Sequence, residues 1–165
     1  MAEGEDRPPI TKQTTLREVP DTVDARPHTV GEDEPLTAVA ENLCEEQGVH
    51  TAAVVDPADR LVGIIPMRIV LDELFLALAP EEFLVEMREM AGVEEFGRIS
   101  RAQTARELME EPVYVTMDDT VREAFVRMHE AKLEGLPVVD ETMKVVGYLD
   151  RFQLLRLWLK GRAEG

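Results

Sequence analysis

The sequence predicts an α/β fold of the α+β type, in which two β-α-β-β-α repeats pack through their sheets with pseudo-twofold symmetry. The first supporting observation is composition: 165 residues, 44% hydrophobic and 32% charged, are typical of a globular chain. The second is an internal repeat, since a shift of about 85 positions aligns Pro27 with Pro112 and Val54-Val55-Asp56 with Val138-Val139-Asp140. The third is that strand and helix patterns follow the same order in both copies.

Each repeat begins with a short extended segment, His28 to Val30 in the first copy and Val113 to Val115 in the second. A helix is expected next, and in the second copy Thr120 and Glu123 have the spacing of a capping box. Apolar residues then recur close to the i, i+3, i+4, i+7 pattern of one buried helix face. These residues are Leu36, Val39, Ala40, Leu43 and Cys44 in the first copy and Val121, Ala124, Phe125, Met128 and Leu133 in the second.

Two β-branched runs follow each helix and predict a hairpin with a short loop. In the first copy they are Thr51 to Val55 and Leu61 to Ile65, and in the second Leu136 to Val139 and Lys144 to Leu149. The first strand and the strand after the helix should be parallel through a right-handed crossover. A second helix closes each unit. Because three strands and two helices bury one sheet face poorly, we expect the two repeats to cover each other's sheets.

The chain is expected to divide into five parts. A flexible acidic and polar tail covers residues 1–14, the first repeat 15–79, an acidic helical connector 80–103, the second repeat 104–160 and a short tail 161–165. The segment from Asp72 to Glu95 contains eight acidic residues and a single basic residue, Arg88. Glu82, Glu86 and Glu89 share one helix face, so a Mg²⁺-responsive connector is a minor alternative. A solvated helix face explains the same pattern, and no metal ligands are assigned.

Several function classes are disfavoured by charge and composition. A formal charge of -16 would repel the phosphate backbone of nucleic acid. The apolar run from Leu74 to Ala79 is too short to span a membrane, and the acidic start does not resemble a secretory signal. With Cys44 as the single cysteine, a cytoplasmic protein is expected.

Enzyme chemistry finds little support in the sequence. Ser100 is the single serine and does not lie between glycines, and there is no glycine-rich phosphate loop. His28, His50 and His129 are isolated along the chain, without the tight spacing of metal ligands. We therefore expect no catalytic residues and no catalytic cofactor.

Three motifs carry a family resemblance. They are Thr104-Ala-Arg-Glu-Leu-Met109, Gly135-Leu-Pro-Val-Val-Asp140 and Val145-Val-Gly-Tyr-Leu-Asp150, with weaker copies in Val49 to Asp56 and Leu61 to Ile65. In the order, spacing and duplication of these motifs, the chain resembles a tandem cystathionine-β-synthase (CBS) domain pair, or Bateman module. The resemblance implies a regulatory module that binds an adenosine-containing ligand, AMP, ADP, ATP or S-adenosylmethionine, in clefts between the repeats.

The family's frequent pattern after the last strand is Gly, two apolar residues, Ser or Thr, two variable residues and Asp. The second repeat has Asp150 at the hydroxyl position and Gln153 at the carboxylate position, whereas the first repeat has Pro66 and Ile69. Gln153 can exchange hydrogen bonds with a ribose diol, but Asp150 would repel phosphate unless Arg151 or a metal ion offsets its charge. The second repeat is therefore expected to hold the better site. In this site the adenine base would be enclosed by Val113, Tyr114, Val115, Leu136 and Pro137. Asp150, Arg151 and Gln153 would lie near the ribose and phosphate groups. His50 and Arg68 are further candidate ligand contacts from the first repeat.

Apolar residues surround both closing helices, at Met67 to Leu78 and Phe152 to Leu159, and a helix apolar all round must be covered. The resemblance implies that these helices meet their counterparts in a homodimer; alternatively, the segment from Pro80 to Met90 folds back over them. The leading hypothesis is a stand-alone, non-catalytic sensor that acts on an unknown effector protein. The main alternative is a degenerate pair that serves as a dimerisation or protein-interaction scaffold without nucleotide, as Pro66, Ile69 and Asp150 would permit.

Overall fold

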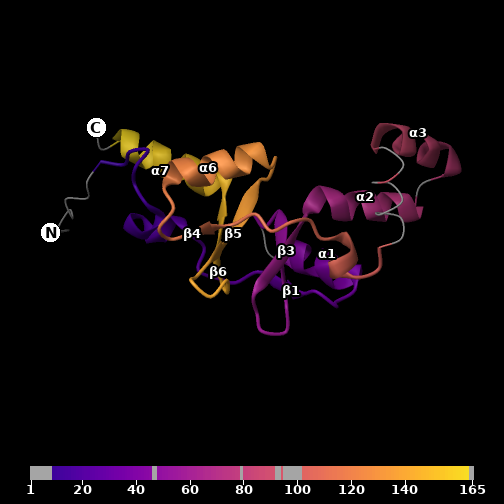
Figure 1. Cartoon of the computed structure of the whole chain (residues 1–165). Coiled ribbons are helices and arrows are strands. Elements are labelled where there is room, and N and C mark those ends of the chain that lie inside the picture. The colour runs from indigo at the N-terminus through magenta and orange to yellow at the C-terminus, as the bar shows by residue number, and fades with distance from the viewer. Residues whose placement is uncertain (1–8, 46–47, 79, 92–93, 95–101, 164–165) are drawn as a thin grey trace.

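The fold contains two three-stranded sheets, each covered by helices, in a computed structural model (Figure 1). The structure describes residues 9–45, 48–78, 80–91, 94 and 102–163. The first sheet has the order β1-β2-β3 and the second the order β4-β5-β6. The strands are β1 (Thr29–Gly31), β2 (Thr51–Val55), β3 (Leu61–Pro66), β4 (Val115–Thr116), β5 (Gly135–Val139) and β6 (Val145–Asp150).

The predicted β-α-β-β-α order is confirmed in both repeats. β1 pairs with β2 in parallel through α1 (Leu36–Glu45), and β4 pairs with β5 in parallel through α6 (Val121–Glu130). The second and third strands of each sheet form the expected antiparallel hairpin. The closing helices are α2 (Met67–Leu78) and α7 (Arg151–Ala163).

Local signals place the helix starts and hairpin turns where the sequence indicates them. Thr120 caps α6: the Glu123 N–H donates to Thr120 Oγ1 over 3.1 Å, and the Thr120 N–H donates to Glu123 Oε2 over 2.8 Å. In the hairpin turns, Asp56 Oδ1 accepts the N–H of Arg60 and Asp140 Oδ1 accepts the N–H of Lys144. The same side-chain cap therefore closes the turn in both repeats.

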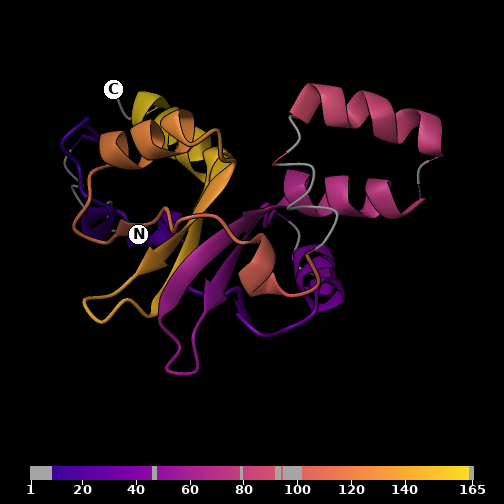
Figure 2. The same cartoon turned by 45° about the vertical axis from the view of Figure 1, so that its right-hand side comes forward.

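The connector contributes the helix α3 (Glu81–Ala91). It lies beside α2 at the end of the molecule away from α7 (Figures 1 and 2). Leu71 on α2 nevertheless stays 54% exposed, and Trp158 on α7 is also 54% exposed. Phe125, expected on the buried face of α6, is exposed as well, because it borders a groove between α6 and α7 rather than the core.

The first segment of each repeat packs on the core of the other repeat. The turn η1 (Leu16–Glu18) opens the first repeat but packs on the second, where the Leu16 N–H donates to the carbonyl of Asp119 over 3.0 Å. The short helix α5 (Ala105–Leu108) opens the second repeat but packs on the first, where the Ala105 N–H donates to the carbonyl of Glu34 over 2.9 Å. A further turn, η2 (Pro20–Thr22), follows η1.

Backbone hydrogen bonds also join these leading segments to the outer strands β6 and β3. Asp24 and Tyr148 exchange two backbone hydrogen bonds, of 2.9 and 2.8 Å, and Ile64 and Glu110 do the same over 3.1 and 2.8 Å. The Tyr148 side chain lies in the core of the first repeat, whereas the Ile64 side chain lies in the core of the second. The two sheets thus cover each other, as the sequence predicts.

Candidate functional site

Tyr148 occupies the junction between the two repeats. Its side chain is 3% exposed, and its hydroxyl accepts the backbone N–H of His50 over 3.0 Å. The ring crosses directly over Gly135 on the neighbouring strand, where a Cβ atom would overlap the phenol. Burial, assisted by the nearby Asp150 carboxylate, raises the pKa of Tyr148 from 10 to about 12. The phenol therefore stays neutral and fills space at this junction.

Asp24 and His28 both contact Tyr148, and Arg26 pairs with Asp24. Asp24 accepts two hydrogen bonds from the Arg26 guanidinium, of 3.1 and 2.9 Å, and its Oδ2 lies 3.3 Å from His28 Nε2. The Arg26 hydrogen bonds hold the pKa of Asp24 well below its usual range, although burial opposes the shift. The buried His28 ring meets Tyr148 edge-on, with centroids 6.0 Å apart. Sequence reasoning treated His28 as isolated; its i, i+4 spacing from Asp24 was the available signal.

Asp150 and Gln153 lie together at the start of α7. The Gln153 N–H donates to Asp150 Oδ1 over 2.7 Å, and the Asp150 N–H donates to Gln153 Oε1 over 2.8 Å. The pair therefore caps the helix reciprocally. The second carboxylate oxygen of Asp150 faces the first repeat, 3.5 Å from where a Cβ on Gly48 would stand. Both side chains are half-buried.

The two arginines that the sequence predicts as phosphate contacts, Arg151 and Arg68, are paired with other groups of the chain. Arg151 Nε donates to the carbonyl of Leu133 over 3.1 Å, and the guanidinium borders the groove between α6 and α7. Arg68 forms an ion pair of 3.5 Å with Glu110, beside the edge of β3. Each guanidinium thus already has a carbonyl or carboxylate partner.

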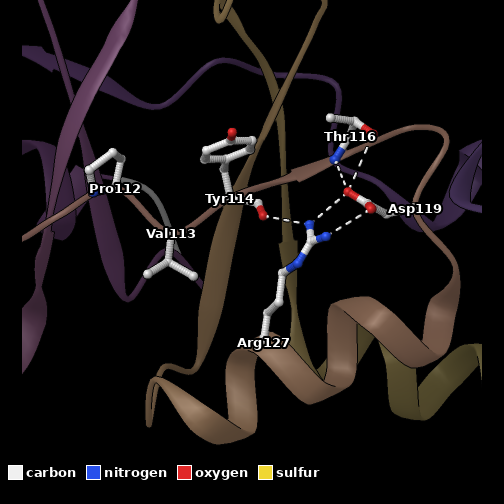
Figure 3. A pocket seen from close by; sticks show the side chains of 6 residues that line it. All are labelled: Pro112, Val113, Tyr114, Thr116, Asp119 and Arg127. Atoms are coloured by element: carbon white, nitrogen blue, oxygen red, sulfur yellow. Dashed lines mark hydrogen bonds and ion pairs between the residues drawn. The ribbon is translucent and has the colours of Figure 1, made fainter.

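A pocket of about 440 Å³ lies beside β4 (Figure 3). Val113 and Tyr114 line it, together with Pro112, Thr116, Asp119 and Arg127. Arg127 Nη1 and Nη2 donate to the two oxygens of Asp119 over 2.7 and 2.9 Å, and Nη1 also donates to the carbonyl of Tyr114 over 2.9 Å. Burial opposes ionisation of Asp119, but hydrogen bonds from Arg127 and the Thr116 N–H lower its pKa overall. The pocket therefore has polar groups that are already paired and an aromatic wall.

The predicted site residues fall into three groups. Val113 and Tyr114 share the pocket beside β4, whereas Asp150 and Gln153 share the start of α7 near the His50 backbone. Val115 and Leu136 are fully buried, and Pro137 is buried on β5. These three pack the core of the second repeat or its sheet, and their side chains are closed to solvent.

Neither a membrane span nor a metal-binding cluster occurs within the described part of the chain. Among residues 9–45, 48–78, 80–91, 94 and 102–163, no helix has the length and apolar character that a membrane span requires. Over the same ranges, no three His, Cys, Asp or Glu side chains gather in a way that could hold a metal ion.

The chain is similar to several solved structures of CBS domain proteins. A CBS domain-containing protein from Thermotoga maritima is 27% identical with a TM-score of 0.71, over 92% of this chain and 99% of that one. The CBS domain pair of protein MJ0100, in complex with 5'-methylthioadenosine and S-adenosyl-L-methionine, is 21% identical with a TM-score of 0.66, over 92% and 98%. CBSX2 in complex with AMP is 23% identical with a TM-score of 0.64, over 90% and 98%. No curated protein matches the chain.

The CBS domain family model matches twice, over residues 12–76 and 105–160. These ranges contain all six strands, and each includes one complete three-stranded sheet. Two matched copies with the same topology, packed through exchanged leading segments, make this chain a member of the CBS domain family in the form of a tandem pair.

Proposed function

We propose that this CBS pair is a non-catalytic regulatory module that binds an adenosine-containing ligand at the second repeat. The observation that carries the proposal is that Asp150 and Gln153 lie together at the start of α7, facing Gly48 of the other repeat. A carboxylate and an amide at one place suit the two hydroxyl groups of ribose. Support also comes from CBS pairs of the same fold, whose structures contain AMP or S-adenosylmethionine.

In this proposal the base lies against Val113 and Tyr114, in the pocket of about 440 Å³, which is within the usual size range for small-molecule sites. β5 separates β4 from β6, and Gly135 at the start of β5 pairs with Asp150, so the start of the parallel strand β4 lies toward the same end of the sheet as Asp150, about 10 Å across by strand spacing. A nucleoside can bridge such a distance. Ligand binding would bias the relative arrangement of the repeats, and a cytoplasmic effector protein would read that change.

Thermal unfolding with AMP, ADP, ATP, S-adenosylmethionine and Mg²⁺, each added separately, tests the proposal. A true ligand at about 100 times its dissociation constant should stabilise the fold by about 2.7 kcal/mol. A shift with an adenosine compound supports the proposal. No shift with any of them, or a shift with Mg²⁺ alone, contradicts it.

Substitutions at Gln153 test where ribose binds. Gln153→Asp restores the family's carboxylate and should tighten binding of the active compound, whereas Gln153→Leu should weaken it. Gln103→Asp, at an exposed position at the end of the connector, makes the same chemical change away from the site and should leave the affinity unchanged. Equal affinity in the wild type and both Gln153 variants would show that ribose lies elsewhere.

A second candidate function, a scaffold without nucleotide, is favoured by one specific observation. Tyr148 fills the junction, and its hydroxyl is already bonded to the His50 backbone. Asp150 also adds negative charge where a phosphate would approach. A scaffold would keep the homodimer through the closing helices that the family resemblance implies, but would show no thermal shift with adenosine compounds.

A further inference from the structure

Asp150 presents a negatively charged oxygen at the junction between the repeats. Its Oδ1 accepts the Gln153 N–H over 2.7 Å, which holds the side chain at the start of α7. Its Oδ2 faces the first repeat, 3.5 Å from where a Cβ on Gly48 would stand. Burial raises the pKa of Tyr148, two residues earlier on β6, and the Asp150 carboxylate adds to that rise. Negative charge therefore lies at the place proposed for ribose.

Two arginines on the surrounding helices already face carboxylates. Arg127 on α6 donates to both oxygens of Asp119, over 2.7 and 2.9 Å, inside the pocket proposed for the base (Figure 3). Arg68 on α2 forms its ion pair with Glu110 over 3.5 Å. A phosphate that approached either guanidinium would have to displace a carboxylate of the chain or share the cation with it.

Arg151 follows Asp150 in the sequence but pairs with other groups. Its Nε donates to the carbonyl of Leu133 over 3.1 Å, and its Nη1 lies 3.9 Å from Glu134 Oε1. Among the residues that the structure describes, no ion pair joins Asp150 to a basic side chain. An anionic ligand bound beside Asp150 would therefore meet a carboxylate that no arginine, lysine or histidine of this part of the chain neutralises.

The 5' substituent of an adenosine ligand is attached directly to the ribose, so it comes close to the same carboxylate. Two unit charges about 4 Å apart change an equilibrium constant by about fivefold even in water, and by more at a half-buried site such as Asp150. A phosphate brings about two negative charges at neutral pH. A thioether brings none, and a sulfonium brings one positive charge.

We infer that the second repeat selects adenosine derivatives by the charge of their 5' group: a sulfonium binds most tightly, a neutral thioether less tightly and a phosphate most weakly. Asp150 is the residue that determines this order. The inference rests on the ligand proposal above and narrows its ligand class to adenosine compounds without a phosphate.

Three probes that share the adenosine group test the order by isothermal titration calorimetry of the full chain. They are AMP, 5'-methylthioadenosine and 5'-dimethylsulfonioadenosine, which carry a negative, a neutral and a positive 5' group. AMP should bind at least about tenfold more weakly than the thioether, and the sulfonium about threefold more tightly. Raising the salt concentration from about 50 to about 500 mM should narrow both differences, because salt screens charge.

Asp150→Asn and Asp150→Thr remove the charge, and both residues can still cap a helix. In each variant the three dissociation constants should lie within about threefold of one another. The ratios are compared within one protein, so a general loss of ribose contacts cancels. The matched control is Asp59→Asn, an exposed acid in the first hairpin turn with a φ of 60° that asparagine also adopts. It should keep the wild-type order, and circular dichroism checks that every variant is folded.

Equal affinities for the three probes in the wild type, or an order that both Asp150 variants keep, would overturn the charge selectivity while leaving an adenosine site. AMP that binds as tightly as the thioether once Mg²⁺ is added would also overturn it, because Asp150 would then hold a metal ion for the phosphate. If none of the probes binds, the ligand proposal itself fails and the selectivity fails with it.

Discussion

At the scale of single residues, one pair of equivalent strand positions differs between the two repeats. The second repeat combines Gly135 with Tyr148, and the first combines Thr51 with Ile64 at the equivalent places. The sequence pattern predicted Thr51, Ile64 and Tyr148 as strand residues, whereas the predicted strand of the second repeat began at Leu136, one residue after Gly135. It could not predict that Tyr148 enters the core of the other repeat, because alternation identifies a buried face without saying which elements bury it.

Replacing Gly135 with alanine should destabilise the fold by about 1–3 kcal/mol. The added Cβ would meet the Tyr148 phenol, which is held between the two repeats and has no space to move into. Urea unfolding measures the change. Gly161→Ala is the control, because its Cβ would come no closer than 3.4 Å to Ile10 and alanine favours the helix. Equal stability of Gly135→Ala and wild type would show that Tyr148 is mobile.

The raised pKa of Tyr148 makes stability depend on alkaline pH. In the unfolded chain the phenol ionises near 10, whereas the folded protein keeps its proton until about 12. The stabilisation is complete below pH 10 and is lost as the pH rises to about 12, by about 2–3 kcal/mol. Urea unfolding between pH 8 and 12 should show a steeper decline for the wild type than for Tyr148→Phe. Parallel curves for the two proteins would contradict the assignment.

At the scale of elements, two helices of the second repeat begin with the same reciprocal cap. The Thr120 and Glu123 cap was predicted from spacing, whereas Asp150 and Gln153, also three residues apart, were interpreted as ligand contacts. A capping pair and a ligand pair use the same polar residue types, so spacing alone does not separate the two roles. The strands and hairpins were predictable to within about two residues because turn chemistry marks their ends.

Removing the cap of α6 should cost about 1 kcal/mol. In Thr120→Ala the Glu123 N–H loses its acceptor, whereas Thr120→Ser keeps the hydroxyl and should remain close to wild type. Urea unfolding of the three proteins at neutral pH provides the measurement. A serine variant as unstable as the alanine variant would show that the threonine methyl group, not the cap, is what matters.

At the scale of the whole molecule, the repeats are interlocked through their leading segments. Leu16 lies in the core of the second repeat, and Leu108 lies in the core of the first. The repeat in the sequence could not reveal this exchange, because a segment that packs on its own repeat and one that packs on the other have the same pattern. The candidate site was only partly predictable for the same reason: residues from both repeats, such as Gly48 and Asp150, meet through packing that local periodicity does not encode.

Interlocking predicts that the two repeats unfold together in one transition. Leu16 and Leu108 are completely buried, so alanine at either position should cost about 2–5 kcal/mol. Because each leucine supports the repeat that does not follow it in the chain, Leu16→Ala should weaken amide protection in β5 as well as in β2, and Leu108→Ala should do the same. Calorimetry measures the number of unfolding transitions, and hydrogen exchange measures the amide protection in each strand. Two separate transitions, or loss of protection confined to one sheet, would mean that the repeats are independent and that a ligand at one could not bias the other through the core.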